Sequence, residues 1–206
     1  MVILMVMRVS QTVVLLAFAA VVASPVIASG PSSVTVIDDF RDSHGTAVIG
    51  TRWESFTDRV MGGRSDMSAG IVRDDGRNVL RMSGRVSLEN NGGFIQVRLP
   101  LAASGTLDAG AYDGVILEVR TGAGEYSIHL RDDRTRLPWA YYRHSIDAGD
   151  DWTVVRLPFR EFDSEGMLVS RAPNAGRLRS IAVVATGDNA AALIEVRSIG
   201  LYRHDS

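Results

Sequence analysis

The segment GVILEVRTGAGEYSIHLR, residues 114–131, decides the fold class. Its two halves each alternate apolar and polar positions, and the apolar set comprises Val115, Leu117, Val119, Tyr126, Ile128 and Leu130. Alternation with a period of two is the pattern of a β-strand with one buried face. The glycine-rich stretch at residues 121–124 lies between the halves and favours a turn. We therefore expect two strands whose apolar faces pack into a common core.

Short apolar runs of this kind recur along the rest of the chain and are separated by Gly, Asp and Asn clusters. They predict about ten strands, at residues 34–40, 68–72, 78–83, 94–99, 114–120, 126–131, 140–146, 153–157, 180–185 and 193–202. No long amphipathic helix is apparent, and short helical pieces are expected only near residues 57–61 and 159–162. The pattern predicts an all-β protein, a single β-sandwich of jelly-roll type.

Composition excludes several classes of function. The 206 residues contain no cysteine, so disulfides, thiolate metal sites and cysteine nucleophiles are excluded. All 22 basic residues are arginine, which excludes a Schiff-base or P-loop lysine. The formal net charge of −2 argues against nucleic acid as a partner.

The amino terminus resembles an export signal. An apolar run at residues 13–22 follows Arg8 and a polar Ser-Gln-Thr, and small residues precede position 29. The run is too short for the roughly 20 residues of a membrane-spanning helix. We expect a signal peptide at residues 1–28, a short lead at 29–33, a domain at 34–206, and a periplasmic or secreted protein. Cleavage after Ala23 or Ser24 and an uncleaved membrane anchor are the alternatives.

The densest unusual segment runs from Trp53 to Ser65 and reads WESFTDRVMGGRS. Adjacent glycines permit a positive φ or a close backbone approach that other residues do not. The segment is either a structural turn that packs Trp53 and Met61 into the sandwich or a loop that binds a ligand or partner. In the second case the binding residues are Asp58, Arg59, Met61, Gly62, Gly63 and Ser65.

A second segment, ENNGGF at residues 89–94, leads into a predicted strand. Asn-Gly and Gly-Gly pairs form turns, so a hairpin connection is one interpretation. The other is a loop rim that binds a sugar or peptide through Asn91, Gly92 and Gly93, with Gln96 and Arg98 on the outward sheet face.

A third segment, residues 131–144, places aromatic side chains among Arg and His. Arg131, Trp139 and Tyr141, with Tyr142 beside them, could form a stacking platform for a sugar or a protein interface. Alternating aromatic residues in a sandwich usually include a core residue, which is the structural alternative.

Catalysis and metal binding have little support in the sequence. No HExxH or GxSxG motif occurs, and the four histidines lack metal-ligand spacing. Acidic doublets fall at strand ends, where we expect them to cap turns in water, and a structural calcium ion at one of them is the alternative to no cofactor. If the protein were a glycosidase, Glu118 and Glu195 would be its candidate catalytic carboxylates.

Several motifs resemble the complex I intermediate-associated protein 30 family. Its signature, Trp…Asp-x-Val-Met-Gly-Gly-x-Ser, corresponds to Trp53 and residues 58–65. Later blocks continue the resemblance to about residue 203, and they include GRVSL at 84–88, NGGF at 91–94, YDG at 112–114, LPFREF at 157–162 and IEVRSI at 194–199. The resemblance implies a galactose-binding-domain-like sandwich and a non-enzymatic role in assembling respiratory complex I.

Together these observations predict a non-catalytic, exported binding domain. Its partner is expected to be a protein client, such as an assembly intermediate of a membrane complex, bound through the loop at residues 58–65 and the turn at 91–94. The alternative is a carbohydrate-binding module that acts on cell-envelope glycans. A hydrolase is a third, less supported hypothesis.

Overall fold

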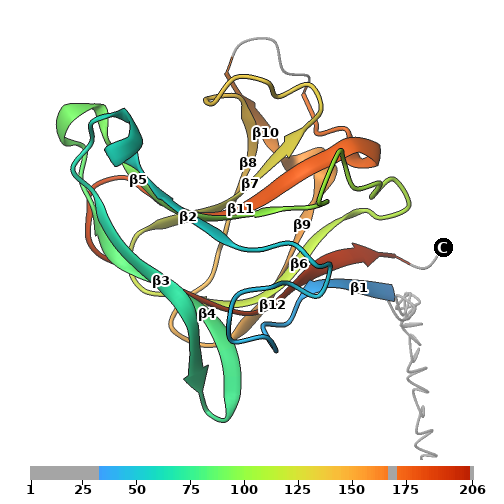
Figure 1. Cartoon of the computed structure of the whole chain (residues 1–206), viewed down its shortest axis with the longest axis horizontal. Coiled ribbons are helices and arrows are strands. Elements are labelled where there is room, and N and C mark those ends of the chain that lie inside the picture. Colours follow the sequence, from blue (N-terminus) through green and yellow to red (C-terminus); the bar gives the residue numbers. More distant parts are fainter. Residues whose placement is uncertain (1–32, 167–170, 205–206) are drawn as a thin grey trace, which may run out of the picture.

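The computed structural model describes residues 33–166 and 171–204, and over these residues the chain forms two antiparallel sheets of six strands each. The two sheets face each other (Figure 1). The first sheet contains β1 (Ser33–Asp38), β3 (Asp66–Asp74), β4 (Arg77–Val86), β6 (Gly114–Thr121), β9 (Thr153–Pro158) and β12 (Asn189–Arg203). The second contains β2 (Glu54–Thr57), β5 (Phe94–Pro100), β7 (Glu125–Asp132), β8 (Tyr141–Ser145), β10 (Asp163–Glu165) and β11 (Leu178–Thr186).

The first sheet is built around its longest strand. The order is β3-β4-β12-β6-β9, and β1 pairs with the end of β12 that β4 leaves free. In the second sheet the order is β10-β8-β7-β11-β5-β2. Short 3-10 helices connect the strands at η1 (Asp58–Met61), η2 (Glu89–Asn91), η3 (Phe159–Glu161) and η4 (Ala175–Arg177).

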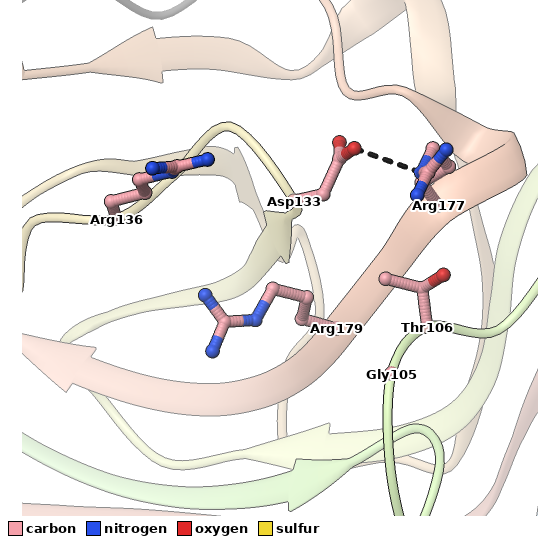
Figure 2. Close-up of a pocket in the computed structure, with 6 residues that line it drawn as sticks. All are labelled: Gly105, Thr106, Asp133, Arg136, Arg177 and Arg179. Atoms are coloured by element: carbon pink, nitrogen blue, oxygen red, sulfur yellow. Dashed lines mark ion pairs between the residues drawn. The ribbon is translucent and has the colours of Figure 1, made fainter.

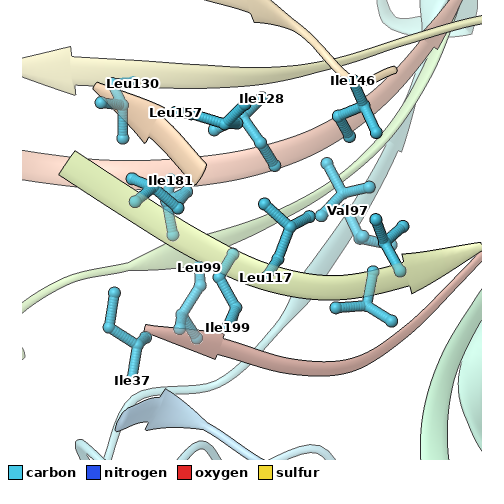
Figure 3. Close-up of a cluster of buried hydrophobic side chains, with 14 of the residues drawn as sticks. Ile37, Val97, Leu99, Leu117, Ile128, Leu130, Ile146, Leu157, Ile181 and Ile199 are labelled. Carbon is cyan, nitrogen blue, oxygen red and sulfur yellow. The ribbon is translucent and has the colours of Figure 1, made fainter. Parts of the chain in front are cut away.

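The core lies between the two sheets, where apolar side chains from both layers meet (Figure 3). The six alternating residues predicted for the 114–131 segment are all buried there. Ile95, Val97 and Leu99 of β5 are buried as well, so their neighbours Gln96 and Arg98 point to the opposite face. The prediction of an all-β sandwich is therefore confirmed.

Three details of the sequence prediction need correction or fall outside the structure. Strands β2 and β10 were not expected, because they are very short edge strands without an alternating apolar pattern. The segment at residues 89–94 is not a hairpin, since it carries the chain from β4 in the first sheet to β5 in the second. The predicted signal peptide at residues 1–28 lies outside the described residues.

Candidate functional site

Two loops meet at one end of the sandwich, η1 after β2 and η2 before β5, and Figure 1 shows them next to each other. Thr57 begins η1, and its hydroxyl accepts a hydrogen bond from the backbone N–H of Arg59 at 3.3 Å. Gly62 ends the helix with φ of 91°, a left-handed conformation that favours glycine. The chain therefore turns sharply after a single helical turn.

The carboxylate of Asp58 lies buried at the base of both loops. It accepts hydrogen bonds from the backbone N–H of Ser65 at 3.0 Å, the hydroxyl of Ser65 at 2.5 Å and the backbone N–H of Gly93 at 2.7 Å. Burial raises the pKa of Asp58, but these hydrogen bonds outweigh burial and hold the pKa below its ordinary value of 3.8. The loop at residues 58–65 and the turn at 91–94, which the sequence assigns to one binding surface, therefore lie side by side.

The folded loops require glycine at residues 63 and 92, because the backbone there lies too close to the Asp58 carboxylate to leave room for a Cβ atom. A Cβ on Gly63 would lie 2.3 Å from Cγ of Asp58, and a Cβ on Gly92 would lie 2.5 Å from Oδ2 of the same residue. The loop amides thus point at the protein's own carboxylate. Asp58, Ser65 and Gly93 tie the two loops together, and Gly63 and Gly92 pack against the Asp58 carboxylate, which corrects the expectation that the groups of these five residues face a ligand directly.

The loop pair exposes three large apolar side chains. Val60, Met61 and Leu88 are 72%, 60% and 58% exposed, and we call these three residues the apolar loop surface. Around them, Arg59 donates to the carbonyl oxygen of Ser65, and Arg64 forms an ion pair with Glu89 at 3.2 Å. Met61 was expected either in the core or at a binding site, and it lies outside the core.

Trp53, by contrast, belongs to the core edge. Its indole N–H donates to Oδ2 of buried Asp38 at 2.7 Å, and its ring lies 5.9 Å from the ring of Phe40. Burial raises the pKa of Asp38, partly offset by the hydrogen bond from Trp53. The predicted segment therefore combines an anchored beginning with an exposed tip.

The outward face of the second sheet carries a different set of groups. Its centre is formed by small buried residues of β7 and β11, and longer half-buried side chains flank them on both sides. Cross-strand register places Arg98, Ala182, His129 and Arg143 in one row across four strands. We call this surface the open sheet face: Phe56, Gln96, Arg98, Ser127, His129, Arg131, Tyr141, Arg143, Ala182 and Val184.

Two ring contacts shape the open sheet face. His129 stacks on Tyr141 with ring centroids 4.1 Å apart and planes 10° from parallel. Burial lowers the pKa of His129 to about 3, and the nearby charge of Arg143 contributes, so the imidazole is neutral at physiological pH. On the other side, Arg98 lies 4.4 Å above the ring of Phe56 and pairs with Glu54 at 2.8 Å.

The aromatic residues of the segment at 131–144 lie in three different environments. Tyr142 is fully buried, Tyr141 lies on the open sheet face, and Trp139 is 61% exposed in the turn before β8. Arg131 donates to the carbonyl oxygens of Thr135 and Leu137, which fixes the turn after β7. The expectation of one core residue within this aromatic group is correct.

The carboxylates of the hydrolase hypothesis are engaged in ion pairs on the outer face of the first sheet. Glu195 is bound by Arg81 at 2.6 Å and by Arg120 at 2.5 Å. Glu118 contacts Arg197 at 3.4 Å and Arg77 at 3.7 Å. Each carboxylate therefore has a structural partner on both sides, and nothing in this arrangement supports a catalytic pair.

Several acidic doublets are also bound internally, which corrects the expectation that they cap turns in water. Asp38 and Asp132 are buried, and Asp74 pairs with both Arg120 and Arg197. Within residues 33–166 and 171–204, Asp, Glu and His side chains do not gather in a group of three that could hold a metal ion. The described part of the chain contains no helix long and apolar enough to cross a membrane.

The loop motif identifies the family. The family model described as "Complex I intermediate-associated protein 30 (CIA30)" matches residues 39–193, which include both tied loops. The chain belongs to the complex I intermediate-associated protein 30 family. The resemblance stated from the sequence is thereby confirmed. A comparison with curated proteins gives no match.

Several solved structures similar to this family member are carbohydrate-binding modules. A family 11 module of a cellulosomal cellulase from Clostridium thermocellum gives a TM-score of 0.65 at 16% identity, covering 84% of this chain and 95% of that one. A family 11 module from the same organism in complex with a β-1,3-1,4-mixed-linked tetrasaccharide gives a TM-score of 0.64 at 16% identity, covering 84% of this chain and 96% of that one. A family 30 module from the same organism gives 0.57 at 14% identity, with coverage of 84% and 99%. At these identities the likeness shows the shared sandwich fold.

Several groups at these sites were not predicted from the sequence. Val60 and Leu88 were not singled out, although each is a large apolar residue in a segment where the strand pattern lapses. His129 and Phe56 were also missed, because their place on the open sheet face depends on which strands become neighbours.

Proposed function

We propose that the chain is a non-catalytic binding domain that engages a protein client through the apolar loop surface. The observation that carries this proposal is the exposure of Val60, Met61 and Leu88 at the tip of two tied loops. Large apolar side chains that gather at an exposed surface commonly mark interaction sites. The family's description as complex I intermediate-associated supports a client that is an assembly intermediate of a membrane complex.

The tied loops suit this task because they need little reordering on binding. Hydrogen bonds from Ser65 and Gly93 to Asp58 and from the backbone of Ser87 to Ser65 hold both loops at their base. A preorganised surface loses less conformational entropy when it binds. The Arg64–Glu89 pair supplies a polar rim beside the apolar side chains.

The test compares two triple variants in cells that assemble complex I. The loop variant is Val60→Ser, Met61→Ser and Leu88→Ser, and the matched control replaces exposed Val48, Val154 and Leu193 with serine. Tagged proteins are purified, and copurifying complex I subunits are quantified by mass spectrometry. We expect the loop variant alone to lose these subunits. Equal recovery with both variants, or no recovery with the wild type, would refute this function.

Export is part of the proposal. The sequence pattern at residues 1–28 supports a periplasmic or secreted location after cleavage near Ala28. Cell fractionation together with amino-terminal sequencing of the mature protein tests both points. A cytoplasmic protein that retains residues 1–28 would overturn this part.

A second candidate function is carbohydrate binding at the open sheet face. It is favoured by the His129–Tyr141 stack beside a shallow row of small residues, an arrangement in which a flat ring can pack on a sugar. The similar folds of carbohydrate-binding modules support it. Calorimetry with neutral glucan oligosaccharides should show binding that Tyr141→Ala removes and Tyr112→Ala, at another site, leaves unchanged. Absence of binding to all glycans tested would remove this candidate.

A further inference from the structure

A hollow of about 490 Å³ lies at the end of the second sheet opposite the apolar loop surface. It is formed by the segment after β5, the β7–β8 connection and the beginning of β11. We call it the arginine hollow, and it is lined by Gly105, Thr106, Asp133, Arg136, Arg177 and Arg179 (Figure 2). Neither the apolar loop surface nor the open sheet face includes these residues.

The arginine hollow carries more positive than negative charge. Among the described residues that line it, Asp133 is the only carboxylate, and it pairs with Arg177 at 2.8 Å. Among the described residues, Arg136 and Arg179 have no carboxylate within ion-pair distance. Figure 2 shows their guanidinium groups on different segments, bordering one space. Two guanidinium groups are therefore available to a ligand.

The surroundings do not neutralise this charge. Asp132, the nearest acidic neighbour in sequence, is already bound by Arg134 at 2.5 Å. Burial lowers the pKa of Arg131, and the positive charges of Arg98 and Arg179 lower it further. Arg131 is thus close enough to Arg98 and to Arg179 to be repelled by each, and an anion bound beside Arg179 would relieve part of that repulsion.

The lining also restricts the chemistry of the ligand. The described lining residues include no aromatic side chain and no aliphatic side chain larger than the methyl group of Thr106, so an apolar ligand would gain little burial. Guanidinium groups bind carboxylate and sulfate oxygens through paired hydrogen bonds. The volume falls within the range of small-molecule sites rather than that of a single inorganic ion. A hydrophilic molecule that bears an oxyanion fits these conditions.

We propose that the arginine hollow binds an acidic saccharide, with Arg136 and Arg179 on its carboxylate or sulfate group. Thr106 offers its hydroxyl to the sugar hydroxyl groups. Ser180, next to Arg179 in sequence, pairs with Arg131 across the β11–β7 register, so the hollow lies beside the open sheet face. The proposal rests on the carbohydrate-binding function above and extends it to a charged sugar.

The test measures binding of three probes by calorimetry: a polyuronate oligosaccharide, a neutral glucan oligosaccharide of equal length, and sodium sulfate. The variant is Arg136→Gln with Arg179→Gln. The control, Arg73→Gln with Arg203→Gln, removes the same charge from exposed positions elsewhere. We expect the variant to bind polyuronate roughly tenfold more weakly or worse, the control to match the wild type, and added salt to weaken binding.

The outcomes separate the two proposals. If neutral glucan binds but polyuronate binds no better, or if the variant binds polyuronate like the wild type, the acidic-saccharide site is wrong and the open sheet face keeps its function. Binding of sulfate with the same affinity as polyuronate also overturns the site, because the sugar then contributes nothing. If neither saccharide binds, both proposals fail.

Discussion

The hydroxyl of Ser65 connects two loops that are distant in sequence. It donates to Oδ2 of Asp58 at 2.5 Å and accepts the backbone N–H of Ser87 at 2.9 Å. A buried hydroxyl with both a donor and an acceptor partner leaves no unsatisfied group. The shape of the apolar loop surface therefore depends on side chains beneath it that no client would touch.

Replacing Asp58 with asparagine should destabilise the domain. The asparagine side chain has the same shape as aspartate but no charge. An NH₂ group replaces one carboxylate oxygen and then faces other donors, which should lower the free energy of unfolding by on the order of 2–4 kcal/mol. The folded-state pKa is lowered, so the carboxylate stabilises the protein above pH 3.8 and this contribution is lost as the pH falls further. Urea unfolding should thus show a deficit at neutral pH that shrinks in acid. Asp66→Asn, at an exposed ion pair, is the control.

Gly63→Ala should be far more damaging than Gly70→Ala. The new methyl group at residue 63 would overlap Cγ of Asp58 at 2.3 Å, whereas a Cβ on Gly70 meets no atom within 4 Å. We expect a loss of about 3 kcal/mol or more at residue 63 and a change within about 1 kcal/mol at residue 70. Thermal unfolding of the two variants measures the difference. Equal melting temperatures would show that the loops do not depend on this close approach.

His129 should make the domain less stable in mild acid. Its pKa is about 3 in the folded protein against 6.5 for the free side chain, so the unfolded chain takes up a proton that the folded chain does not. Stability is then complete above pH 6.5 and falls as the pH drops towards 3, by up to about 1.4 kcal/mol per pH unit. His129→Phe keeps a ring against Tyr141 and should flatten this slope. An unchanged slope in the variant would assign the acid sensitivity to other groups.

Glu195→Gln should lower stability without affecting any of the three proposed sites. The side chain of Glu195 is almost fully buried. Glutamine has no charge, so the variant leaves Arg81 and Arg120 without the carboxylate that they share. Because these arginines are partly exposed, we expect a cost of about 2–3 kcal/mol. Glu161→Gln, in an exposed pair with Arg160, should change stability by less than about 0.5 kcal/mol. Denaturant unfolding compares the two.

The sequence predicts those parts of the fold that depend on local pattern. Strands with an alternating buried face, such as β5 to β7, are recognisable because side-chain period and burial coincide. β2 and β10 are held by pairing to a neighbour rather than by their own pattern, and the path from β4 to β5 between sheets leaves no local trace. Those features come from long-range pairing.

The proposed binding sites likewise depend partly on local sequence pattern and partly on long-range contacts. Paired glycines at residues 62–63 and 92–93 predict close backbone approaches, yet the group approached is Asp58, which is 35 residues from Gly93 in sequence. The arginine hollow combines three separate segments, and arginines are so common in this chain that no local pattern distinguishes them. Spatial neighbours of this kind become visible only in the folded structure.

Strands β5 and β11 connect the apolar loop surface with the arginine hollow. β5 begins directly after Gly93, β11 begins directly after Arg177, and the seven residues of β5 span about 20 Å. A client at one end and a saccharide at the other would be held at a fixed spacing without a linker. Such a domain would act as a rigid adaptor that keeps a protein beside a glycan matrix.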